Sequence, residues 1–266
     1  MFGEKIMKLR DKFWLWGHPE GRYNHEFGND GESRMTPMEA CLYLGIRNTF
    51  MTPVGWQVDR RQYNKSFISL NEVGWECCKA ATDPTLVNPI IAEAKDFPNV
   101  KRIVFDDFAV YNGRNPIEME NLWKVKDRLQ NNEVRPMEMW MTVYSCDLGH
   151  TEREDDFHRE ALKPFDGATM WTWGEGLIPQ IPEKWEIFKS MTEGKQRHIG
   201  VYLWDFGDRR ESDPALIKPQ LDWARERILE GEANGLVLHT NTMADLDLAS
   251  YVEAVEWMNE HGDEEI

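Results

Sequence analysis

The sequence predicts a single (β/α)8 barrel over residues 1–266, and two observations favour this fold class. Strand-like apolar runs alternate strictly with helix-like segments, eight times from end to end. The chain has 266 residues, and about 250 is the usual length of such a barrel. An open doubly wound sheet is the rival, but its Gly-rich phosphate loop is missing after the first strand, where the sequence reads GHPEG.

The expected strands are short runs rich in aromatic and β-branched residues, the composition typical of strands in half-buried or buried sheets. FWLWGH opens the series, and the fourth strand lies within VKRIVFDDF. We place the eight strands at residues 13–18, 49–55, 72–78, 100–108, 135–145, 167–175, 197–206 and 233–241.

The expected helices follow from capping residues and apolar spacing. Thr36, Pro37 and Glu39 form a capping-box start for the first helix. Segment 115–132 carries apolar residues at three- and four-residue spacing. Pro219 lies inside segment 213–231, where proline is expected to kink a helix. We place the eight helices at residues 36–46, 59–70, 85–97, 115–132, 154–165, 182–194, 213–231 and 245–262.

Composition limits the partners and cofactors that we expect. The net charge is −16 and no basic stripe is present, so we expect no nucleic-acid partner and no anionic membrane partner. No apolar run reaches bilayer length, and the N-terminus lacks an apolar signal core, so we expect a cytoplasmic protein or one whose leader has been removed. The four cysteines lack zinc-site spacing, so we expect reduced thiols, no metal and no cofactor.

Acidic and aromatic residues gather at the predicted C-terminal ends of the strands, where the active sites of such barrels lie. The strand interiors are mostly apolar by contrast. The pair Asp106 and Asp107 is the strongest case, because it ends a buried run. Otherwise an acid at such a position caps the next helix or pairs with an arginine such as Arg114. The acid pair therefore predicts the mouth of a site.

Two carboxylates at this mouth indicate hydrolysis of a glycosidic bond, in which one acid protonates the leaving oxygen and the other attacks the sugar or activates water. Strands four and six lie two positions apart, so Asp107 and Glu175 are expected to converge. Glu175 lies among Trp171, Trp173 and Gly174, and an apolar surrounding raises a carboxyl pKa, which suits a general acid. We assign Glu175 as the general acid and Asp107 as the nucleophile or base. Asp106 stays a candidate because the sequence does not decide which face of the strand points inward.

Aromatic and polar residues at the same strand ends are expected to bind the substrate, because flat apolar faces stack on sugar rings. Tryptophan also fills cores, and Asp205 could equally begin a loop. The Gly- and Asn-rich loop 18–35 is expected to cover one side of the mouth. The substrate-binding candidates are His18, Tyr144, Trp171, Trp173, Trp204, Asp205 and His239.

These residues together resemble a glycoside-hydrolase-type TIM barrel. The resemblance rests on FDDF at 105–108, MWTWGEG at 170–176 and YLWDFG at 202–207. It implies a carbohydrate substrate and a pair of catalytic acids. In several such families the pair comes from strands four and six, whereas in many others strand seven supplies the second acid, which would be Asp205. The Asn-Glu pair and the DxxDxDxE motif of particular families are absent, so the resemblance names a broad type.

Two other functions stay open. One is a metal-dependent sugar isomerase, epimerase or hydrolase, since several carboxylates and a histidine are typical ligands of a divalent ion. Its ligands would come from His18, Glu76, Asp107, Glu175, Asp205 and His239. The other is a non-catalytic carbohydrate-binding barrel, in which the tryptophans stack on sugars and the acids accept hydroxyl hydrogen bonds.

Overall fold

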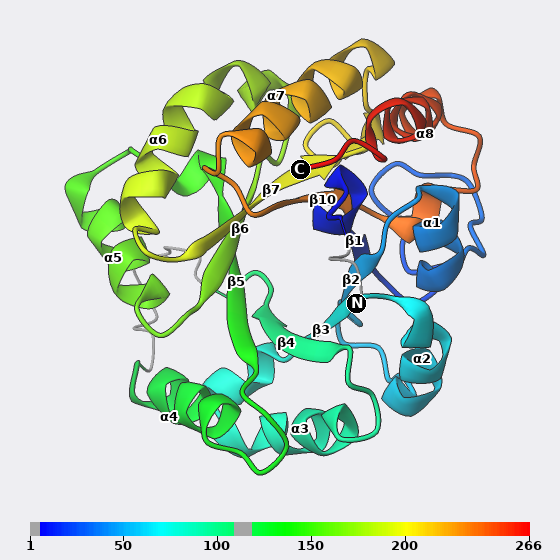
Figure 1. Ribbon diagram of the computed structural model, residues 1–266. Coiled ribbons are helices and arrows are strands. Elements are labelled where there is room, and N and C mark those ends of the chain that lie inside the picture. The colour runs from blue at the N-terminus through cyan, green and yellow to red at the C-terminus, as the bar shows by residue number, and fades with distance from the viewer. Residues whose placement is uncertain (1–5, 109–118) are drawn as a thin grey trace.

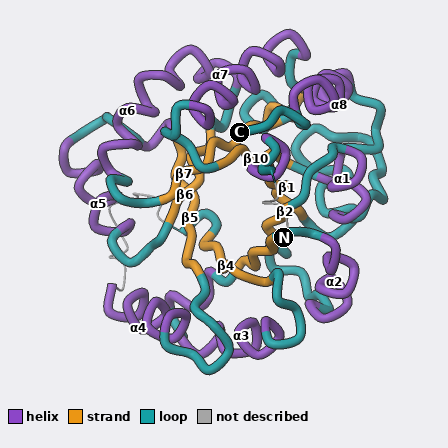
Figure 2. Tube along the Cα trace, viewed as in Figure 1, coloured by secondary structure: helices purple, strands orange, loops and turns teal. Residues whose placement is uncertain are grey.

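The computed structural model describes residues 6–108 and 119–266. Eight parallel strands close into a barrel in the order β1-β10-β7-β6-β5-β4-β3-β2, and the helices form a ring around it (Figure 1). The same two layers are seen in Figure 2, where the strands enclose the axis and the helices lie outside. The prediction of a (β/α)8 barrel is confirmed.

All eight expected strands are present, each shorter than the apolar run that predicted it. Several runs included residues that lie beyond the parallel hydrogen-bond ladder. The strands are β1 Phe13–Gly17, β2 Asn48–Met51, β3 Glu72–Glu76, β4 Val100–Phe105, β5 Glu138–Tyr144, β6 Gly167–Trp171, β7 Gln196–Tyr202 and β10 Gly235–His239. A further hairpin, β8 Trp204–Asp205 with β9 Arg210–Glu211, lies outside the barrel and was not predicted.

The expected helices are also present. Thr36 caps the first of them, accepting a hydrogen bond from the Glu39 backbone, while the Glu39 carboxylate accepts one from Thr36 N at 2.8 Å. Residues 115–118 of the expected fourth helix lie outside the described residues. The helices are α1 Pro37–Tyr43, α2 Arg60–Ser66, α3 Asn88–Ala94, α4 Met119–Gln130, α5 Glu152–Leu162, α6 Ile181–Met191, α7 Ile217–Leu229 and α8 Ala249–His261.

Proline at position 219 does not divide its helix, which corrects the expected kink. α7 runs continuously from Ile217 to Leu229, and Pro219 is its third residue. The backbone nitrogens of the first helical turn have no partner within the helix, so a proline there removes no helical hydrogen bond.

Large aromatic side chains on the strands lie against glycines of the neighbouring strand. Trp140 is in register with Gly167, and Trp171 with Gly200. A Cβ atom at Gly200 would lie 2.2 Å from Trp171, and one at Gly167 would lie 2.7 Å from Trp140. The absence of a side chain at these glycines is therefore what lets the tryptophans lie flat in the barrel wall.

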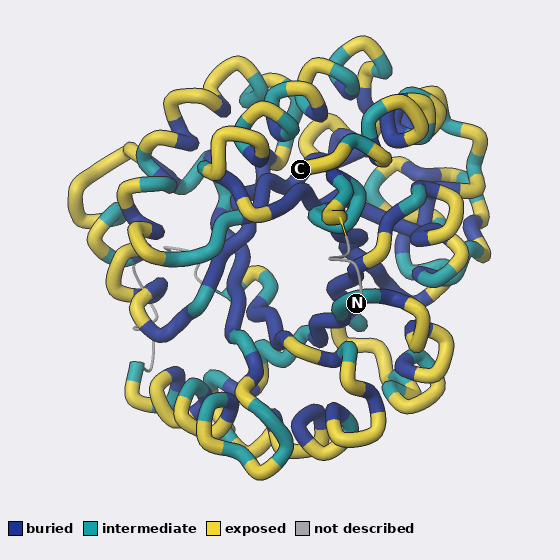
Figure 3. Tube along the Cα trace, in the orientation of Figure 1, coloured by how far each residue is buried: buried dark blue, intermediate teal, exposed yellow. Residues whose placement is uncertain are grey.

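The core occupies the barrel and the layer between strands and helices. Figure 3 shows the strands as buried and the outer helix faces as exposed. Trp16, Phe50 and Trp140 are fully buried, and each aromatic side chain of this kind removes about 150–250 Å² from water. Among the described residues, no helix combines the length and apolarity needed to cross a bilayer.

Candidate active site at the barrel mouth

A cavity of about 130 Å³ opens at the C-terminal ends of the strands. Both aspartates of the predicted pair line it, together with Arg22, Val54 and His239. Among the described residues, eight aromatic side chains also line it: Trp16, Tyr23, Phe27, Tyr144, Trp171, Trp173, Tyr202 and Phe206. The aspartate pair therefore meets part of the expected aromatic residues, namely Tyr144, Trp171 and Trp173, around one small space.

The backbone explains how two adjacent acids reach the same cavity. Side chains alternate between faces only while the chain stays extended, and β4 ends at Phe105. Asp107 has φ of 49°, in the left-handed region. Its amide donates to Thr142 Oγ1 at 3.1 Å, which anchors this turn to β5. The question of which aspartate points inward is thus resolved, because both line the cavity.

The two aspartates have different electrostatic surroundings. Burial, the negative charge of Asp107 and that of Glu76, in this order, raise the pKa of Asp106 well above its usual value. Asp107 is the more exposed of the pair, and its carboxylate accepts a hydrogen bond from the Tyr144 hydroxyl. The site therefore holds one carboxyl group that favours its protonated form beside one carboxylate stabilised by a hydroxyl donor.

Glu175 lies in a neighbouring, smaller cavity that Asp106 and Asp107 do not line. Its carboxylate accepts hydrogen bonds from Arg210 Nη2 and from the backbone nitrogen of Asp213, each at 2.5 Å. The structure does not bring Glu175 into the cavity of the aspartate pair, because the β8–β9 hairpin supplies Arg210 as its partner.

Asp205 and Trp204 belong to the same neighbouring cavity. Asp205 is buried, and one of its oxygens accepts from the backbone nitrogens of Gly207 and Asp208 at 2.9 and 3.0 Å. Trp204 donates from Nε1 to the Phe27 carbonyl oxygen at 3.1 Å, which holds the loop after β1. Trp173 lines both cavities and forms the wall between them.

The two histidines form a buried pair, of which only His239 lines the cavity. Burial lowers the pKa of His18 to about 3 and the pKa of His239 well below its usual value. His18 Nδ1 lies 2.7 Å from the Thr52 carbonyl oxygen, which can only accept, so Nδ1 carries the single proton of the neutral ring. His18 Nε2, 3.3 Å from His239 Nε2, is then an acceptor. His18 thus contacts His239 on the side away from the cavity and helps to hold its ring in position.

Several lining residues were missed at the sequence level. Arg22, Tyr23 and Phe27 come from the loop after β1, which is expected at the mouth, but none of the three is among the candidates from the sequence. Tyr202 ends β7, whereas the apolar run predicts a strand to residue 206 and so places Trp204 and Asp205 at its end. Correct placement of the strand end would have found Tyr202.

The ligand set of the metal-dependent alternative is divided between locations. His239 and Asp107 line the mouth cavity, whereas Glu175 and Asp205 line its neighbour. Over residues 6–108 and 119–266, no three His, Cys, Asp or Glu side chains are grouped so that they could hold a metal ion.

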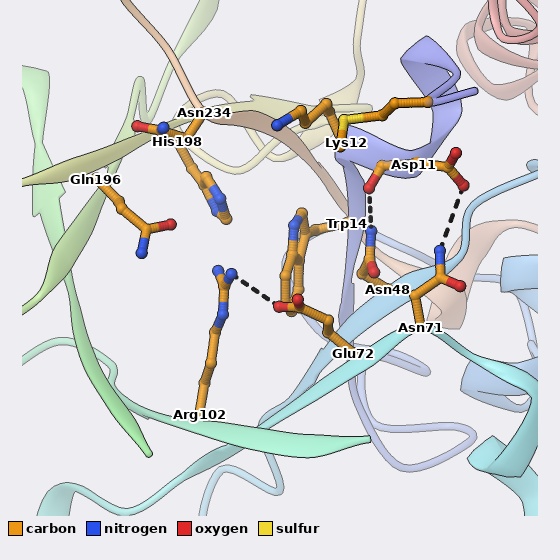
Figure 4. A pocket seen from close by; sticks show the side chains of 11 residues that line it. Asp11, Lys12, Trp14, Asn48, Asn71, Glu72, Arg102, Gln196, His198 and Asn234 are labelled. Atoms are coloured by element: carbon orange, nitrogen blue, oxygen red, sulfur yellow. Dashed lines mark hydrogen bonds and ion pairs between the residues drawn. The ribbon is translucent and has the colours of Figure 1, made fainter. Parts of the chain in front are cut away.

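A larger cavity of about 280 Å³ lies at the opposite, N-terminal end of the strands (Figure 4). The Arg102 guanidinium lies 4.3 Å from the ring centre of Trp14 and 4.6 Å from that of Trp140. Its charge is balanced by Glu72 at 2.7 Å and Glu138 at 2.9 Å. This end of a barrel usually contributes to stability. We interpret the cluster as an ion-pair network that stabilises the N-terminal end of the barrel.

Solved structures with the same fold include enzymes of different chemistry. The catalytic domain of a Pyrococcus furiosus chitinase has a TM-score of 0.62 at 14% identity, covering 98% of this chain and 100% of that chain. An endo-β-N-acetylglucosaminidase from Cordyceps militaris has a TM-score of 0.58 at 12% identity, covering 93% and 91%. The Pyrococcus furiosus tryptophan synthase α-subunit has a TM-score of 0.53 at 10% identity, covering 96% and 100%.

The fold is shared with glycoside hydrolases. No protein-family model and no curated protein sequence matches the chain. Since the tryptophan synthase subunit has this fold too, the shared barrel alone does not determine the reaction.

Proposed function

We propose that this protein is a glycoside hydrolase that uses Asp106 and Asp107 as its pair of acids. The observation that carries the proposal is that two adjacent carboxyl groups line one aromatic cavity at the mouth of the barrel. Burial raises the pKa of Asp106, and the Tyr144 hydroxyl donates a hydrogen bond to Asp107. Glycoside hydrolysis needs such a pair, one group protonated and one ionised.

The reaction follows from the surroundings of each acid. Asp106 gives its proton to the glycosidic oxygen as the bond between this oxygen and the anomeric carbon breaks. Asp107 either attacks the anomeric carbon or takes a proton from the water that attacks it. The Tyr144 hydroxyl, which donates to Asp107, holds this carboxylate in place, because a charge-assisted hydrogen bond is short and directional.

The aromatic wall supports a carbohydrate as substrate. Trp173 is 37% exposed and stands at the rim, where an indole face can pack on the apolar face of a sugar ring. The chitinase and the endo-β-N-acetylglucosaminidase with the same fold are glycosidases by name, which favours this class of reaction over others that the barrel hosts.

Glu175 takes a different role in this proposal from the general acid expected from the sequence. Its contacts with Arg210 and Asp213 tie the β8–β9 hairpin to the end of β6. We therefore assign Glu175 a structural role in the neighbouring cavity. Asp106 is then the acid that protonates the leaving group.

Hydrolysis of a panel of nitrophenyl glycosides by the wild type and by D106N, D107N and E175Q tests the proposal. We expect turnover of at least one glycoside, a loss of about 10²–10⁴-fold in D106N and D107N, and less than about tenfold in the matched variant E175Q. Activity in D106N together with loss in E175Q would restore Glu175 as the acid. Sugar binding without turnover of any glycoside would instead favour a carbohydrate-binding barrel.

A further inference from the structure

The described residues around the mouth cavity carry more negative than positive charge. Asp107 lines it, and Glu76 lies close enough to raise the pKa of Asp106. Among the described residues that line the cavity, Arg22 is the one cation. Arg22 is already paired, because its Nη1 lies 2.6 Å from Glu26 Oε2. Within residues 6–108 and 119–266, the cavity wall therefore holds no cation that is free to offset the charges of Asp107 and Glu76.

The wall of the cavity is itself attractive to cations. The face of an aromatic ring carries negative charge density, and a cation within about 6 Å of the ring centre is stabilised by it. The structure shows one such contact at the rim, where the guanidinium carbon of Arg22 lies 5.1 Å from the centre of the Tyr23 ring. The remaining aromatic side chains include Trp171, Trp173 and Tyr202, which pack on one another around the same space.

The size of the cavity limits the cation to a compact one. About 130 Å³ is well below the roughly 300–1,000 Å³ of pockets that enclose drug-sized ligands. A cavity of this size can surround a single sugar ring that enters from its open side.

We propose that the cavity selects a sugar that carries a protonated amino group. This inference rests on the proposed function for the sugar and on the excess negative charge and aromatic wall for the amine. The ammonium group offsets the charges of Asp107 and Glu76, which a neutral sugar leaves uncompensated. Burial is the largest cause of the raised pKa of Asp106, and a bound ammonium leaves that burial in place.

Titration calorimetry with two sugars of the same ring tests the inference. D-glucosamine at pH 6, where its amine is protonated, is compared with N-acetyl-D-glucosamine, in which acylation removes the charge. We expect glucosamine to bind at least tenfold more tightly. In E76Q and D107N, whose folding is checked by circular dichroism, this preference should fall several-fold, whereas W123A, which removes a half-exposed tryptophan of α4, should retain it.

Equal affinity for the two sugars, or tighter binding of the acetylated one, would overturn the inference. A preference for glucosamine that persists unchanged in both E76Q and D107N would overturn it too, since the amine would then be recognised elsewhere. The proposed function fails separately: a clear glucosamine preference without cleavage of any glycoside, glucosaminides included, would keep the cation site and reject hydrolysis. Cleavage of neutral glycosides alone would keep hydrolysis and reject the cation site.

Discussion

At the scale of single residues, the site depends on the unequal environments of neighbouring acids. Asp106 and Asp107 are adjacent in sequence, yet burial and the charges of Asp107 and Glu76 act on the first, while the Tyr144 hydroxyl binds the second. Residue type alone does not assign these roles. They follow from a left-handed turn at Asp107 and from side chains that β3 and β5 bring near it.

The raised pKa of Asp106 predicts that D106N stabilises the protein at neutral pH. A carboxyl group with a folded pKa above its unfolded value favours folding at low pH, and this contribution is lost as pH rises from the unfolded pKa through the folded one. Asparagine resembles the protonated acid and carries no such penalty. We expect a higher melting temperature for D106N at pH 7, by about 2–4 °C for each kcal/mol relieved, and no gain at pH 3. An equal gain at both pH values would contradict this.

The hydroxyl of Tyr144 gives a second prediction at this scale. Y144F removes the donor to Asp107, and a hydrogen bond to a charged group contributes about 1.5–3 kcal/mol. We expect kcat/KM for the best glycoside to fall about 10–100-fold. Y63F is the matched control, because the Tyr63 hydroxyl donates to the Glu20 carboxylate at 2.7 Å outside the cavity. Similar losses in both variants would argue against a role of Tyr144 at the site.

At the scale of elements, the pairing of large and small residues across neighbouring strands shapes the barrel wall. Trp171 of β6 covers Gly200 of β7, and Trp140 of β5 covers Gly167 of β6. Because Trp171 also lines the cavity, the glycine on one strand helps to set the position of a side chain in the site.

Alanine at these glycines is therefore expected to destabilise the barrel. A Cβ at Gly200 would overlap Trp171, and overpacking of this kind costs about 1–3 kcal/mol. Urea unfolding of G200A should show this loss, together with weaker sugar binding. G176A is the control, since no atom lies within 4 Å of the Cβ that it would add, and its stability should stay within about 0.5 kcal/mol of the wild type.

At the scale of the whole molecule, the two ends of the barrel differ in character. In the part of the chain that the structure describes, the C-terminal end holds acids whose charge is not matched by cations of the cavity wall. At the N-terminal end, Arg102 is held between two tryptophans and neutralised by Glu72 and Glu138. The first arrangement is suited to a ligand and the second to stability.

This division predicts that R102M and D107N have opposite effects. R102M removes the buried cation that Glu72 and Glu138 share. Because both carboxylates are partly exposed and Glu72 keeps Lys101, we expect a cost of about 1–3 kcal/mol. We expect a marked loss in urea stability for R102M, with kcat/KM of the folded fraction within a few-fold of the wild type. D107N should keep its stability and lose activity. Loss of activity in folded R102M would show that the two ends are coupled.

The alternation of strands and helices could be predicted because it depends on local apolar patterns and on capping signals such as Thr36 and Glu39. The strand ends were less predictable. The runs that contain Asp107 and Asp205 continue past the last ladder residue, since a turn or a hairpin begins there without a break in residue type. For this reason the sequence pattern predicts Asp205 at the mouth, where the structure has Tyr202 instead.

The barrel, with acids and aromatic residues at one end of it, could be derived from the sequence because apolar periodicity and helix-capping signals are local. Which acids share a cavity depends on the folded chain. Arg210 binds Glu175 across 35 residues, and Thr142 anchors Asp107 across 35 residues. Such long-range partners fix where each carboxylate points and which charges surround it, and no local pattern encodes them.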